Sequence, residues 1–300
     1  MTAAAAATRV PATGPAGRSA LARLTRRPAG TISLGLVTLL VLVAVFAPYL
    51  APYDGAAQHI PQRLQGPSRA HLLGTDQLGR DLLSRIMLGL RIELSVAIPG
   101  VAIALALGLI LGLAAGYLGG RSDNVVVVCL DTIQAFPSMV LALVLVAVLG
   151  PSLPDLVAVL AITFAPQSAR ATRASVLALR RQPFIEAERS LGVRTPRILA
   201  VHVVPNIIAP LLILLTMNIP SAITVEAGLS FLGLGVQPPT PSWGVILSDG
   251  FANVYQAPWA VIWVGLALVI TTVGFTTLGE TLRDVCDPHR VIPARTRRGR

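Results

Sequence analysis

The stretch FIEAERSLGVRTPRILAVHVVPNIIAP, residues 184–210, places charged side chains between two long apolar segments of the protein. Within it, Phe184, Ala187 and Leu191 lie at positions i, i+3 and i+7, which is the spacing of one apolar face on a short helix. Gly192 follows directly, and glycine readily adopts the left-handed conformation with which many helices end. The pattern therefore predicts a short helix with an apolar face that ends near position 191.

A second short helix is predicted immediately after the first. Thr195 followed by Pro196 is typical of an N-cap residue and a first helical residue. A bent segment with an apolar face, set between membrane-spanning segments, is expected to bind a soluble protein. Charged side chains are expected to keep the bend in water: Glu186, Glu188, Arg189 and Arg194.

The composition is typical of a membrane protein. Hydrophobic residues make up 54% of the 300 residues, charged residues 13%, and the mean hydropathy is +0.71, whereas about 25% charge is usual in soluble domains. All 24 basic residues are arginine. Because a P-loop requires a lysine, the protein is not a conventional P-loop ATPase, and an ATP-driven function needs a partner. The arginines lie between apolar runs rather than along one stripe, which argues against nucleic-acid binding.

Six apolar segments suit membrane-spanning helices in a hydrocarbon layer of ~30 Å. The expected fold is therefore all-α and polytopic. A cleaved signal peptide is the competing interpretation of the first segment, but the long region before it and the later segments favour a retained anchor. The predicted spans are Thr31–Leu50, Leu94–Tyr117, Val125–Leu149, Leu156–Ala169, Ile207–Ile223 and Trp259–Leu278.

The distribution of arginine predicts the orientation. Five arginines precede the first span, seven lie in residues 168–197 and six follow the last span, whereas residues 226–258 have none. Because cytoplasmic loops are enriched in Lys and Arg, both termini and the 184–210 stretch are expected in the cytoplasm. Residues 59–91 conflict with this pattern, since they carry five arginines and are expected outside.

Two further patterns concern packing. Asp76 with Arg80, and Asp81 with Arg85, are each spaced i, i+4, which predicts structural ion pairs on a helix at the membrane surface. Glycines recur every four residues in the second span, which predicts a small-residue face for close helix packing. These glycines are Gly108, Gly112 and Gly116.

One set of residues in the 184–210 stretch resembles the EAA loop of ABC importer permeases: Glu186, Ala187, Gly192, His202, Pro205 and Asn206. Two longer stretches, His71–Arg91 and Glu226–Gly250, resemble the C-type subunit of the dipeptide, oligopeptide and nickel branch of that family. Both are long and ungapped, and together they are rich in Gly, Pro and charge, so a chance match is improbable. The resemblance extends from about Thr31 to Val291.

The resemblance implies a type I ABC importer transmembrane domain in the bacterial plasma membrane. It implies a non-catalytic permease subunit that lines the translocation path together with a homologous B-type permease, as a heterodimer in membrane lipid. Two cytoplasmic ATPase subunits and an extracytoplasmic substrate-binding protein are the other implied partners. The coupling helix would seat in the ATPase, to which Phe184, Ala187 and Leu191 present their apolar face. ATP and Mg²⁺ are used by the ATPases, and the permease itself is expected to bind no cofactor, metal or nucleic acid.

The protein is expected to be organised as follows. Residues 1–30 form a disordered cytoplasmic tail, and 31–91 the first span and an external loop with its surface helix. Residues 92–282 form the five-helix permease core, within which 171–206 is the coupling loop. Residues 283–300 form a basic cytoplasmic tail.

Four residues are candidates for the translocation path or its gate: Asp131, Gln134, Pro137 and Glu226. An ionisable residue inside a membrane is a functional candidate. For Asp131 the favoured interpretation is structural, with a position near the interface and a partner in Arg121 or a helix end. Pro137 is expected to bend its helix. Glu226 either lies buried between subunits, where it helps to close the path, or is exposed at the surface.

The sequence gives less support to two other classes of function. A secondary transporter needs an ion site in mid-membrane, commonly built from internal repeats, and an intramembrane enzyme needs a catalytic set. The sequence shows no repeat and no catalytic or metal-binding motif, and Cys129 and Cys286 lack ligand spacing. The expected substrate is a dipeptide or oligopeptide. Nickel chelates are the alternative, and haem or glutathione also remain open.

Overall fold

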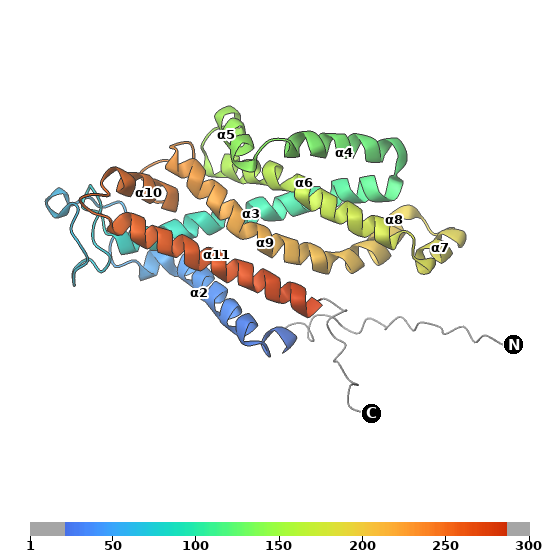
Figure 1. Cartoon of the computed structure of the whole chain (residues 1–300), viewed down its shortest axis with the longest axis horizontal. Coiled ribbons are helices and arrows are strands. Elements are labelled where there is room, and N and C mark those ends of the chain that lie inside the picture. The colour runs from blue at the N-terminus through green and yellow to red at the C-terminus, as the bar shows by residue number, and fades with distance from the viewer. Residues whose placement is uncertain (1–21, 287–300) are drawn as a thin grey trace, which may run out of the picture.

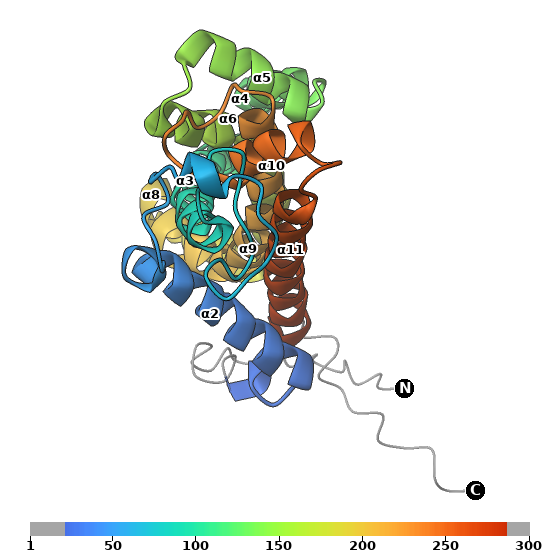
Figure 2. The same cartoon turned by 90° about the vertical axis from the view of Figure 1, so that its left-hand side faces the viewer.

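The computed structural model describes residues 22–286, which fold into a long bundle of helices (Figures 1 and 2). The expected all-α fold is confirmed, because the described residues form no strand and only one isolated bridge, between Thr75 and Asp81. The helices are α2 (Pro28–Leu50), η1 (Ile60–Gln62), α3 (Leu82–Leu113), η2 (Ala114–Leu118), α4 (Gly120–Gln134), α5 (Ser138–Leu149), α6 (Leu153–Leu179), α7 (Pro183–Ser190), α8 (Thr195–Ile198), η3 (Leu199–Val203), α9 (Val204–Phe231), α10 (Trp243–Ala252) and α11 (Trp259–Cys286).

Within the described residues, four continuous helical segments are long and apolar enough to cross a membrane, or five if the bent pair α4 and α5 forms one span. Helix α6 contains the remaining expected span. It has 27 residues, about 40 Å at 1.5 Å per residue, but it is more polar than the others. The count of six spans therefore stays a prediction. The four segments are Pro28–Leu50, Leu82–Leu118, Thr195–Phe231 and Trp259–Cys286.

The third expected span is broken in two. Helix α4 ends at Gln134, α5 begins at Ser138, and the two axes differ by 92°. Pro137 is the N-cap of α5, and a proline both lacks an amide hydrogen and disfavours helical geometry at the residue before it. The expectation of one helix over Val125–Leu149 is therefore wrong, and the expected bend at Pro137 is a complete break.

Helices α3 and α6 pack along the predicted glycine face. A Cβ atom added at Gly108 would lie 2.4 Å from the Cβ of Ser168, and one added at Gly112 would lie 2.4 Å from the Cβ of Thr172. At Gly116 the distance to the Cβ of Val176 would be 2.9 Å. Such distances leave no room for a side chain, so the small-residue face predicted from the spacing is confirmed.

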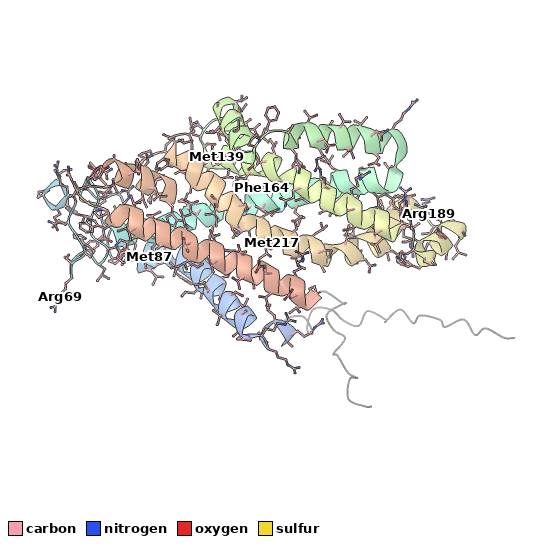
Figure 3. The ribbon with its side chains drawn as sticks, in the orientation of Figure 1. Arg69, Met87, Met139, Phe164, Arg189 and Met217 are labelled. Atoms are coloured by element: carbon pink, nitrogen blue, oxygen red, sulfur yellow. The ribbon has the colours of Figure 1, made fainter. Side chains whose placement is uncertain are left out.

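The bundle has two different ends. We call the end formed by residues 51–81 and α10 the loop end, and the opposite end, which carries α7 and α8, the α7 end (Figure 1). Helix α2 begins and α11 ends toward the α7 end (Figure 1). Figure 3 shows Arg69 at the loop end and Arg189 at the α7 end. The two termini of the helical bundle and the 184–210 stretch therefore lie on the same side.

Three helix or segment boundaries in the structure differ from those expected from the sequence. The helix expected across His71–Arg91 is wrong, because residues 71–81 form a loop and α3 begins only at Leu82, with Asp81 as its N-cap. Residues 22–30 are not a disordered tail, since Leu24 is buried and α2 begins at Pro28. Helix α11 continues to Cys286, into the expected basic tail. Residues 1–21 and 287–300 of the two expected tails lie outside the described residues.

Candidate coupling loop and translocation surface

Helix α7 has apolar residues on two sides. Ile185 is fully buried, whereas the side of Phe184 and Leu191 is free, with these residues 44% and 80% exposed. Ile185 belongs to a buried apolar cluster with residues of several other helices: Leu105, Tyr117, Val176, Ile198, Val203, Ile207 and Leu211. One side of α7 therefore anchors it to the bundle, and the face predicted from the spacing at positions 184, 187 and 191 remains open.

The end of α7 has the glycine geometry that the sequence predicts. Gly192 has φ +74°, which is costly for residues with a Cβ atom. Its amide donates to the carbonyl of Arg189, and the amide of Val193 donates to the carbonyl of Glu188. These bonds satisfy carbonyls that the helix end would leave unpaired.

Two polar contacts hold α7 against the bundle. The Arg189 guanidinium lies 4.8 Å from the centre of the Tyr117 ring, and its Nε donates to the Tyr117 hydroxyl at 3.2 Å. On the other side, Glu188 lies 3.4 Å from Nε2 of His202, whose ring also contacts the edge of Phe184. Because Tyr117 belongs to η2 and His202 to η3, α7 is attached to the ends of two long helical segments.

The second short helix continues into a membrane span. Helix α8 is followed by the π-helical turn η3 and then by α9, so that residues 195–231 are one helical segment. The N-cap is Arg194, with φ −63° and ψ 137°, so the expected N-cap at Thr195 is one residue late. Pro205 and Asn206 are exposed in the first turn of α9, and the Asn206 amide donates to the carbonyl of His202 at 2.6 Å.

A groove of about 840 Å³ lies between α7 and the start of this segment. It places the exposed Leu191 beside the cationic side chains of the second helix. A partner that fills it would have to combine apolar and acidic groups. The groove is lined by Glu188, Leu191, Gly192, Val193, Arg194, Arg197, Val201 and His202.

Asp131 does not pair with Arg121. Its carboxylate lies 2.5 Å from the guanidinium of Arg170 on α6, and both side chains are about half exposed. A second pair joins the same helices, since Arg173 makes two bonds of 2.6 and 2.7 Å to Asp123. The expected partner is wrong because α4, freed by the break after Gln134, lies along α6.

Gln134 and Pro137 lie at the break itself, where a cavity of about 370 Å³ opens between α4, α5, α6 and α9. The sequence alone did not mark its other polar residues, which are Ser138, Thr163, Gln167 and Ser221. The available signal was the presence of hydroxyl and amide side chains inside expected spans. The cavity is lined by Ile133, Gln134, Phe136, Ser138, Leu141, Thr163, Phe164, Gln167, Ser221 and Val225.

Glu226 is fully buried, so the interpretation that it is exposed is wrong. Its Oε1 accepts a hydrogen bond of 2.6 Å from the Ser230 hydroxyl. Its carboxyl group meets that of Glu93 on α3, which is also fully buried and accepts the Trp243 backbone amide at 3.0 Å. The Oε2 atoms of both carboxyl groups are buried and lack a hydrogen-bond partner in the described structure, so this acidic pair is a costly feature of the packing. Sequence analysis missed Glu93, although an acid inside an apolar span was a sufficient signal.

The variant Glu226→Gln is expected to unfold at the same temperature as the wild type or higher. Glutamine can still accept from Ser230 and can donate to Glu93, and it removes one potential charge. Glu226→Ala, in contrast, leaves the buried Ser230 hydroxyl without its acceptor, which costs about 1–3 kcal/mol. Thermal unfolding of the purified protein in detergent measures both. Equal melting temperatures for the two variants would contradict a stabilising role for the Glu226–Ser230 hydrogen bond.

The ion pairs at the loop end differ from the expected ones. Arg80 pairs with Asp76 at 2.6 Å, but this pair lies in the loop and is buried, not on a surface helix. Arg85 pairs with Asp76 and, at 3.6 Å, with Asp249 of α10. The expected Asp81–Arg85 pair is therefore wrong.

Asp81 instead caps α3 and binds an imidazole. It accepts the amide of Ser84 at 2.8 Å and lies 2.9 Å from Nδ1 of His71. Together with the Asp249 contacts, these bonds fasten the loop to α3 and α10. Among the described residues, no group of three His, Cys, Asp or Glu side chains is arranged to hold a metal ion.

Comparison with known proteins gives two family matches. Residues 104–291 match the family described as "Binding-protein-dependent transport system inner membrane component". Residues 16–67 match the "N-terminal TM domain of oligopeptide transport permease C". The methionine ABC transporter MetNI, in inward-facing structures, contains a chain with the same fold. The TM-score is 0.51 at 19% identity, covering 69% of this chain and 96% of that one.

Curated relatives are similar over nearly the whole chain. The dipeptide transport system permease protein DppC of Alkalihalophilus pseudofirmus is 40% identical, covering 90% of this chain and 89% of the relative. The glutathione permease GsiD of Pectobacterium atrosepticum is 40% identical over 86% of each sequence. The nickel permease NikC of Escherichia coli is 37% identical over 87% of this chain and 94% of the relative. The resemblance inferred from the sequence is confirmed, and the chain belongs to the family of binding-protein-dependent transport system inner membrane components.

Proposed function

We propose that this protein is the permease subunit of an ABC importer that moves dipeptides or oligopeptides into the cell. The observation that carries the proposal is the free apolar face of α7, which the Arg189–Tyr117 and Glu188–His202 contacts hold at the end of the bundle. The names of the relatives DppC and OppC support the peptide, while NikC and GsiD make nickel and glutathione the alternatives.

ATP hydrolysis belongs to separate subunits in this proposal. The sequence has no lysine, and a P-loop requires one. Two ATPase subunits would take up the face of Phe184, Ala187 and Leu191, with the α7 end and both termini in the cytoplasm. A homologous permease would complete the path, and a substrate-binding protein would dock at the loop end from outside.

The geometry supports a direct mechanical route. Movement of α7 would displace Tyr117 and His202, to which it is attached, and with them the segments 82–118 and 195–231. These segments would then move between inward-open and outward-open arrangements. The permease makes no covalent bond in this cycle.

Gly192→Asp is expected to leave membrane insertion intact and to abolish the stimulation of ATP hydrolysis by the loaded binding protein. The left-handed conformation disfavours a side chain by about 1–2 kcal/mol, and the new carboxylate stands beside the exposed Leu191. Gly120→Asp is the matched control, because Gly120 also has a positive φ and open space around it but lies at the start of α4, outside the 184–210 stretch. ATPase assays on the assembled complex test this. Full stimulation in Gly192→Asp would exclude the proposed role of the loop.

A further inference from the structure

The cavity at the break between α4 and α5 has a polar lining without charge. Its polar side chains are Gln134, Ser138, Thr163, Gln167 and Ser221, which belong to α4, α5, α6 and α9. With about 370 Å³ it lies within the range of small-molecule sites. Figure 3 shows Phe164, another lining residue, about midway between Arg69 at the loop end and Arg189 at the α7 end.

Most of these groups have no partner in the described part of the protein. The side chains of Gln134, Ser138, Gln167 and Ser221 make no hydrogen bond there, and Thr163 donates to the carbonyl of Val159. In hydrocarbon, unpaired amide and hydroxyl groups are costly. A surface that gathers several of them halfway along a membrane bundle must therefore face water, another subunit or a solute.

The charges near the cavity compensate each other. Asp131 lies one helical turn before Gln134, Arg170 lies one turn after Gln167, and the two are paired at 2.5 Å. No carboxylate, imidazole or thiol lines the cavity. A bare divalent cation would find no strong ligand there, whereas a series of amides would find both donors and acceptors.

We infer that this cavity is a transient subsite of the path that hydrogen-bonds the backbone of a peptide in transit. Amide side chains donate and accept at once, so Gln134 and Gln167 satisfy backbone carbonyl and amide groups whatever the peptide sequence. The aromatic surfaces of Phe136 and Phe164 would contact its side chains. The inference rests on the proposed function and adds to it a site and a ligand class.

The test uses the complete complex in proteoliposomes with ATP, the loaded binding protein and labelled trialanine. The double variant Gln134→Leu/Gln167→Leu is expected to lower peptide uptake about tenfold, while stimulated ATP hydrolysis stays within about twofold of the wild type. The double variant Gln134→Asn/Gln167→Asn should restore part of the uptake. Thr132→Val, a polar-to-apolar change on α4 outside the cavity lining, should behave as the wild type.

Several results would contradict the proposal that this cavity is a peptide subsite. Unchanged trialanine uptake in the leucine double variant would do so. Loss of co-purification with the partner permease would also do so, because the surface would then be a subunit interface. Failure of the proposed function is a separate outcome, since it would show as absent ATP-dependent trialanine uptake in the wild-type complex. Ni²⁺ added alone serves as a second probe, and its uptake in place of trialanine by the wild type would overturn both.

Discussion

Replacing Phe184 and Leu191 together by aspartate is expected to release the ATPase subunits while leaving the permease folded. Both side chains are exposed in the isolated permease, so the change removes little packing within it. In the complex each would bury apolar surface worth about 1.5–3 kcal/mol, and a carboxylate in its place would have to lose its hydration. The summed loss lowers the affinity by several orders of magnitude.

Co-purification of the ATPases with a tagged permease measures this effect. The control is Leu72→Asp with Tyr255→Asp, two apolar residues that are 60% and 101% exposed at the loop end. These substitutions introduce the same two negative charges and replace side chains that are also exposed, but they lie at the opposite end of the bundle. The control complex should retain its ATPases. ATPases retained in full by the Phe184/Leu191 variant would place the docking surface elsewhere.

Gly112→Leu is expected to prevent α3 and α6 from packing. A Cβ atom at this position would lie 2.4 Å from the Cβ of Thr172 and 2.6 Å from the carbonyl oxygen of Ala169. The second contact is with backbone, so no rotamer change can relieve it, and the helices must separate. Overpacking costs about 1–3 kcal/mol or more in cores that can relax. Here it disturbs the contact between α3 and α6, which extends over several helical turns.

The matched control is Gly265→Leu on α11, where an added Cβ would meet no heavy atom within 4 Å. Both substitutions improve intrinsic helix propensity to the same extent, so any difference reflects packing. Gly112→Leu should fail to accumulate or should melt at least ~5 °C lower, about 2 kcal/mol for a protein of this size, and Gly265→Leu should match the wild type. Similar melting temperatures for the two variants would contradict the conclusion that close packing of α3 against α6 stabilises the protein.

The features that sequence predicted correctly are those in which spacing alone determines a face. The period of four in the glycines that face α6 and the i, i+3, i+7 spacing of Phe184, Ala187 and Leu191 need only helical geometry. Both appear in the structure. Gly192 belongs to the same class, because its conformational freedom is a property of the residue itself.

The errors concern contacts between distant parts of the sequence. The spacing of Asp81 and Arg85 suggested a pair, but Arg85 is directed to Asp76 and Asp249 by the turn at 76–81. The partner of Asp131 depends on the 92° angle between α4 and α5, and no local sequence pattern predicts the size of that angle. Glu93 could be recognised as unusual, but its contact with Glu226 requires the packing of α3 against α9.

The continuity of residues 195–231 has a thermodynamic consequence. These 37 residues form one helical segment, about 55 Å at 1.5 Å per residue, with α7 next to one end and Glu226 and Ser230 near the other. If events at its two ends are linked through it, the linkage must be reciprocal. In the proposed complex, whatever factor ATPase closure applies to the affinity for the binding protein, docking of that protein applies the same factor to the closure equilibrium.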